Sequence, residues 1–145
     1  MAKVGRASRN ASLMRIESVS ADKTILPSES GEIYLVDGST SRTLTLPAVK
    51  EGAYIKVILS VACGGGTTVT IQSAPNTVDI LGVLQQVNAA DHSAGTASDA
   101  GAAGDDKVIF GNSCAAGSYV ELVCDGTKWF ASGLSHGGPL TFDAT

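Results

Sequence analysis

The chain has 145 residues and a formal net charge of −4, and alanine, glycine, serine and threonine fill 64 of its positions. Its length suits one domain, and a hydrophobic fraction of 43% is too high for an intrinsically disordered chain. Its apolar runs are far shorter than the roughly 20 residues of a membrane span, and no apolar stretch follows the basic N-terminus. We therefore expect neither a membrane protein nor a secretory signal.

The charge is unevenly divided along the chain. Residues 1–23 hold five basic and two acidic side chains, whereas residues 24–145 hold five basic and twelve acidic ones. The first segment has little apolar periodicity apart from a short patch at 13–16, which predicts an extended N-terminal arm over residues 1–23. A basic arm on an acidic body favours docking onto a negatively charged partner. The alternative is a basic terminal segment without a binding role.

From residue 24 onward the pattern is typical of β-strands. Residues 32–36 are rich in β-forming side chains, and residues 42–46 alternate strictly between apolar and polar. Residues 53–60 form the longest strand candidate, and 67–71 alternate again after a glycine-rich turn at 64–66.

The middle of the chain is less regular. Residues 79–84 fit either a buried strand or a helical turn by length, and the surrounding β pattern favours a strand. Residues 89–104 contain seven alanines and three glycines, so they have little to bury. We expect a long exposed loop there.

The last third of the chain returns to β patterns. Strand signals occupy 107–110, 118–124 and 127–132, and Asp125-Gly126 joins the last two as a predicted hairpin. No segment keeps a 3.6-residue apolar period. The sequence therefore predicts one all-β domain over residues 24–145, a small antiparallel sandwich or barrel of about eight to ten strands.

Two adjacent aromatic residues draw attention on the last of these strands. Trp129 and Phe130 point to opposite faces of an alternating strand. A ligand platform is one interpretation, but core packing on one face and an oligomer or surface contact on the other explains both residues better.

The three cysteines, Cys63, Cys114 and Cys124, are odd in number and lack the CxxC spacing of metal sites. Their small apolar neighbours indicate buried free thiols and synthesis in a reducing compartment. A Cys114–Cys124 disulfide between adjacent strands is the less favoured alternative.

Catalytic signatures are not evident. His92 and His136 have no metal-type companions, and the aspartates at 99, 105 and 106 lack calcium-loop spacing, so a solvated loop explains them better. We expect no enzymatic activity, no cofactor and no metal site. The aromatic side chains do not interleave with the basic ones and the body is acidic, which also disfavours nucleic-acid binding.

Several β-hairpin patterns together resemble small structural proteins of tailed bacteriophages. They are the succession SGEIYLVD at 30–37, LTLPA at 44–48 and EGAYIKV at 51–57, then VTI at 69–71, KVIF at 107–110, and a final hairpin over 117–133 that contains DGTKW. Many such proteins are head decoration, or cement, proteins, and others are domains of tail fibres. The similarity covers roughly residues 24–135.

The resemblance implies a virion structural protein on the outer surface of an icosahedral capsid, made in the host cytoplasm. It implies a homotrimer that clamps major capsid subunits, with no nucleic acid or membrane as partner. The arm would then contact an acidic capsid surface, since arginine forms bidentate pairs with carboxylates. The candidate capsid-contacting residues are Arg6, Arg9, Leu13, Arg15 and Ile16.

Two alternatives remain open at this point. A tail-fibre or receptor-binding domain would present the 89–104 loop and Trp129 to the host, and its copy number per particle would be far lower. An enzyme would need Asp99, Asp105 and Glu121 to converge.

Overall fold

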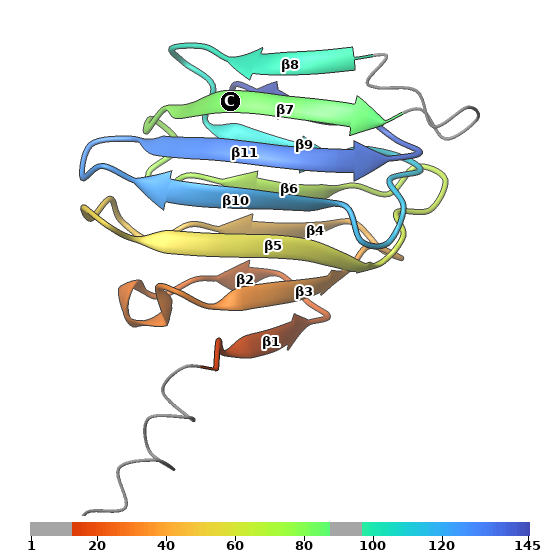
Figure 1. The fold of residues 1–145 in the computed structure, drawn as a ribbon, viewed down its shortest axis with the longest axis horizontal. Coiled ribbons are helices and arrows are strands. Elements are labelled where there is room, and N and C mark those ends of the chain that lie inside the picture. Colours follow the sequence, from red (N-terminus) through yellow and green to blue (C-terminus); the bar gives the residue numbers. More distant parts are fainter. Residues whose placement is uncertain (1–12, 88–96) are drawn as a thin grey trace, which may run out of the picture.

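The computed structural model describes residues 13–87 and 97–145. They form two β-sheets that pack face to face as a sandwich, and the only helix in these ranges is the short 3₁₀ turn η1 (Pro27–Glu29). The predicted all-β class is confirmed. Figure 1 shows the larger sheet in front, from β8 at the top to β1 at the bottom, with the smaller sheet behind it.

The larger sheet has seven strands, and the smaller has five. In spatial order the seven are β1 (Ile16–Val19), β3 (Ile33–Asp37), β5 (Tyr54–Val61), β10 (Tyr119–Cys124), β11 (Trp129–His136), β7 (Ile80–Val87) and β8 (Ala97–Gly101). The five are β12 (Leu140–Asp143), β9 (Lys107–Phe110), β6 (Val69–Gln72), β4 (Arg42–Thr45) and β2 (Lys23–Thr24).

The strand pairing corrects the expected antiparallel architecture, because both sheets are mixed. The hairpin predicted through Asp125-Gly126 is confirmed, since β10 pairs antiparallel with β11. However, β1–β3, β3–β5 and β11–β7 are parallel in one sheet, and β2–β4 and β4–β6 are parallel in the other. From β1 to β7 the chain crosses between the sheets after every strand, and successive strands of one sheet in this stretch run in the same direction.

The folded body begins inside the predicted arm. Residues 16–19 form β1 at one edge of the larger sheet, and residues 23–24 form β2 at the corresponding edge of the smaller sheet. Val19 and Ile25 are buried in the core. Burial of these two side chains outweighs the polar composition around them, and the described residues 13–23 are not a free arm.

The structure also corrects part of the long loop predicted over residues 89–104. Residues 97–101 form β8, which pairs antiparallel with β7 from Gly82↔Gly101 to Gln86↔Ala97. Small side chains do not prevent pairing, because the ladder is made by main-chain hydrogen bonds. Residues 88–96 lie outside the described ranges.

The core lies between the two sheets and is made by the inward positions of each alternating strand. Its largest fully buried side chains include Trp129, Tyr34 and Phe110. In β5, for example, Ile55, Val57 and Leu59 are buried, as the period of two predicts.

Candidate functional site

The two adjacent aromatic residues divide as expected between inside and outside. Trp129 has no exposed surface and lies in the core, whereas 45% of Phe130 is exposed on the outer surface of the larger sheet. Trp129 is therefore not a surface contact, and the fibre interpretation loses the aromatic residue that it would present to a host.

Phe130 belongs to an extended apolar surface, which we call the outer face: the outward side chains of β3, β5, β10, β11 and β7. Strand register arranges them in cross-strand rows. One row runs Tyr54, Val123, Phe130, Leu81, and another runs Leu35, Ile58, Tyr119, Leu134, Gln85. All but Gln85 in these two rows are apolar or aromatic.

The row between them carries the charges of the outer face. It runs Ile33, Lys56, Glu121, Ser132, Val83, and the Lys56 Nζ lies 2.8 Å from the Glu121 Oε1. The same ammonium lies 4.9 Å from the ring centroid of Tyr119. The hydrogen bond to Glu121 raises the pKa of Lys56 despite partial desolvation. The two charges thus neutralise each other within the face.

A second surface lies at the N-terminal edge of the larger sheet, beside β1. Leu13, Met14 and Ile16 are 71%, 52% and 62% exposed, and the outer edge of β1 has no neighbouring strand among the described residues. Arg15 lies between them, with its Nη1 3.0 Å from the Glu32 Oε1. Of the predicted capsid-contacting residues, Leu13, Arg15 and Ile16 gather here, and Arg6 and Arg9 lie outside the described residues.

An ionic cluster fills the corner behind this edge. The Lys23 Nζ lies 2.9 Å from the Glu17 Oε1 and 3.0 Å from the Glu29 Oε1, and it stands over the Tyr34 ring at 5.6 Å. Burial lowers the pKa of Lys23, but the hydrogen bonds to both glutamates outweigh it and the net pKa is raised. Burial, and then the surrounding carboxylates, raise the pKa of Tyr34.

The carboxylates of Glu17, Glu29 and Glu32 are close enough to share one cation. The ammonium of Lys23 already bridges Glu17 and Glu29, and Arg15 pairs with Glu32. The cluster is therefore explained by the protein's own cations, which join β1, β2, η1 and β3.

Among the described side chains, the acidic residues considered from sequence do not gather into one site. Asp105 accepts a hydrogen bond from the backbone of Ala102 at 2.7 Å, and buried Asp106 accepts one from the Thr145 hydroxyl. Glu121 lies on the outer face with Lys56. The Asp99 side chain lies outside the part of the chain described here.

The cysteines are free and buried, so the Cys114–Cys124 bridge considered from sequence is not formed. Burial raises the pKa of Cys114 to about 11, and it also raises the pKa of Cys63. Neither thiol has the lowered pKa of a reactive cysteine.

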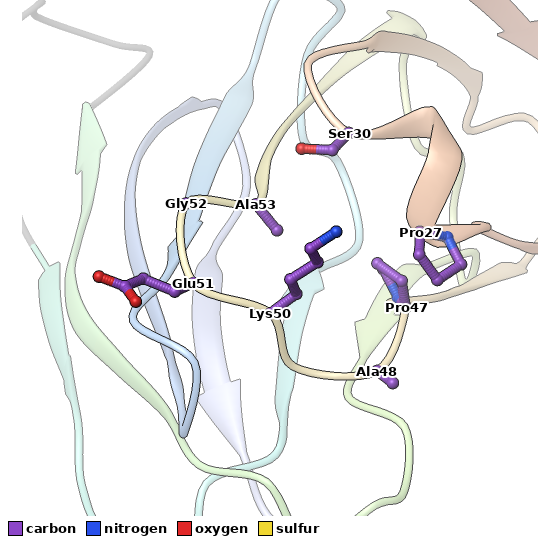
Figure 2. A pocket seen from close by; sticks show the side chains of 8 residues that line it. All are labelled: Pro27, Ser30, Pro47, Ala48, Lys50, Glu51, Gly52 and Ala53. Carbon is purple, nitrogen blue, oxygen red and sulfur yellow. The ribbon is translucent and has the colours of Figure 1, made fainter.

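A shallow pocket of about 160 Å³ lies where the turn around η1 meets the 47–53 loop. Figure 2 shows Lys50 reaching towards Ser30 and Pro27, while Glu51 points the other way. Small-molecule sites usually enclose about 300–1,000 Å³ with several convergent polar groups. This pocket is smaller and offers a single charged group directed into it.

Within the described ranges, no helix has the length and apolar character needed to cross a membrane. The sequence matches no protein-family model, and no curated protein is significantly similar to it. The surfaces described above are therefore the basis for assigning a function.

Sequence reasoning found Phe130 and the apolar patch near residue 13, but it missed the outer face as a whole. A signal was present: 33–36 and 54–59 carry apolar residues at both odd and even positions. Such strands are apolar on both faces, and a strand with both faces apolar is normally covered on both.

Proposed function

We propose that the protein is a non-enzymatic virion structural protein that decorates the outside of an icosahedral phage capsid and stabilises contacts between major capsid subunits. The proposal rests on the resemblance of its hairpin patterns to phage structural proteins and on the kind of surface that it presents. No cofactor takes part.

The observation that carries the proposal is the N-terminal edge. Three large apolar side chains, Leu13, Met14 and Ile16, are more than half exposed beside an open strand edge. An open edge can accept a strand from another protein, with main-chain hydrogen bonds giving affinity. The residues before this edge add Lys3, Arg6 and Arg9 to attract an acidic surface.

Attachment in many copies suits this arrangement. An apolar patch of three side chains gives a modest contact by itself, and repetition over a capsid multiplies such contacts into high avidity. The partner is then the major capsid protein, and the working location is the outer surface of the virion.

The proposal is tested by co-sedimentation of the full chain with expanded capsids that lack it. The variant Leu13→Ser/Met14→Ser should bind roughly a hundredfold or more weakly, because burial of each side chain contributes about 1.5–3 kcal/mol. Val61→Ser is the matched control, since Val61 is 45% exposed but lies at the opposite end of the strands, opposite Asp37.

Deleting residues 1–12 removes Arg6 and Arg9 and stops short of β1. This deletion should weaken binding more at low salt than at high salt, because salt screens the attraction between exposed charges. Full-strength binding by both variants would contradict the attachment role of this edge. A count of a few dozen copies per particle, in place of hundreds, would instead indicate the fibre alternative.

A further inference from the structure

We infer that the outer face of the larger sheet is covered by the same face of a second copy of this chain, in a closed two-fold pair. The inference concerns a surface other than the N-terminal edge, and it differs from the trimer that the resemblance implies.

The outer face presents large apolar side chains to solvent. Phe130, Val123 and Val83 are 45%, 47% and 55% exposed, and they lie among the apolar rows of β10, β11 and β7. Monomeric proteins rarely expose contiguous apolar surface larger than a few hundred Å². A face with this composition is typical of a surface that another protein covers.

The outer face has a size comparable to that of a protein interface. Strands of five to eight residues, spaced about 4.8 Å apart and rising about 3.3 Å per residue, give the five strands of the outer face a projected area of roughly 550 Å². A stable protein interface buries about 800 Å² on each partner. One partner of similar width therefore covers the whole face.

The charge of the outer face favours a second copy as the occupant. The chain carries a net −4, so the repulsion between two copies is smallest where they meet through a surface without net charge. The outer face supplies one, because its Lys56 and Glu121 neutralise each other at 2.8 Å. A charged partner would find no unpaired charge in these central strands to recognise.

The shape of the outer face also suits a closed pair of identical chains. Two apolar sheet faces pack on each other with strands about 30° apart, as the two sheets of a sandwich do. The outer face of the smaller sheet is lined by threonines such as Thr43, Thr70 and Thr141, so it does not match. Like packs against like, the contact is isologous, and assembly stops at two chains.

The test is sedimentation equilibrium of the full chain at micromolar concentrations, without capsids. The wild-type protein should have twice the mass of one chain. Phe130→Glu and Val83→Glu should each raise the dissociation constant of the pair at least a hundredfold, because the contact would bury an unpaired carboxylate. Both positions are outward-facing, and far-ultraviolet circular dichroism with a thermal melt checks that each variant remains folded.

Thr70→Glu and Thr141→Glu are the matched controls, since they place the same charge on the outer face of the smaller sheet. They should leave the mass unchanged. A wild-type monomer, a mass of three chains, or a pair that survives both Phe130→Glu and Val83→Glu would overturn the inference. Because no capsid is used, these results are independent of the attachment experiment.

Discussion

The two sheets of this sandwich share one architecture, but their outer surfaces differ in polarity. Outward positions of β10, β11 and β7 are mainly apolar, whereas outward positions of β4, β6 and β12 are mainly threonine. Threonine and valine are both β-branched, so both favour strands equally well. The two sheets therefore differ in the polarity of their outward side chains and not in their architecture.

The largest expected difference in the free energy of unfolding is between substitutions at two neighbouring residues. Trp129→Ala should lower the free energy of unfolding by about 3–5 kcal/mol, because Trp129 is fully buried between the sheets. Phe130→Ala should lower it by less than about 1 kcal/mol in dilute solution, where single chains dominate. Urea unfolding of both variants measures the difference.

Equal losses for the two substitutions would contradict the division into core and outer face. Repeating the Phe130→Ala measurement at high protein concentration tests whether Phe130 also contributes to the pair. A loss that grows with concentration is expected when Phe130 contributes to the pair.

The next effect concerns the backbone that supports the outer face. Gly82 in β7 has φ +145°, and a Cβ there would lie 1.8 Å from the carbonyl oxygen of Ala131 in β11. Gly82→Ala should therefore lower the free energy of unfolding by about 2–3 kcal/mol, because it strains the backbone and forces β7 and β11 apart.

Gly65→Ala is the matched control, since a Cβ at Gly65 would meet nothing within 4 Å. Thermal melts compare the two variants. If they melt together, the close approach of β7 and β11 is not required for the larger sheet.

The smallest effect lies at the corner that joins the two sheets. The backbone N–H of Leu26, and then Lys23, hold the pKa of Glu29 below its ordinary value of 4.5. The carboxylate form is thus favoured in the folded state, and its contribution is present above about pH 4.5. It is lost as the pH falls through the lower folded pKa.

Glu29→Gln should accordingly lower the free energy of unfolding by up to about 1 kcal/mol at pH 7 and have less effect near pH 3. Urea unfolding between pH 7 and pH 3 measures this change, with the exposed Glu51→Gln as the control. A constant difference between wild type and Glu29→Gln over that range would contradict the role of the ionised carboxylate.

Much of the fold could be predicted from local patterns. The strands of the regions 32–36, 42–46, 53–60 and 118–124 were found because alternation and turn residues are encoded within a few positions. The strands β1 and β2 were not, because these short edge strands depend on main-chain pairing with β3 and β4, which are not the next strands in the chain. The strand β8 was not, because its small and polar residues carry no apolar alternation. The strand at Leu140–Asp143 was missed as well, although its residues alternate.

The candidate surfaces could likewise be predicted only in part. Trp129 and Phe130 could be assigned to opposite faces from the period of two alone. The Lys56–Glu121 pair and the apolar rows could not be predicted, because they depend on which strands are neighbours. That information comes from pairings between strands that are far apart in the chain, such as β5–β10 and β11–β7, which leave no local trace in the sequence.

The path of the chain between the sheets has a consequence for how the protein folds. From β1 to β7 every strand enters the sheet opposite to its predecessor, so consecutive strands in this stretch are never hydrogen-bonded neighbours. Neither sheet can therefore be completed before the other, and loop closure precedes most of the native pairing. We expect slow, all-or-none folding on the millisecond-to-second timescale, with no half of the sandwich stable alone.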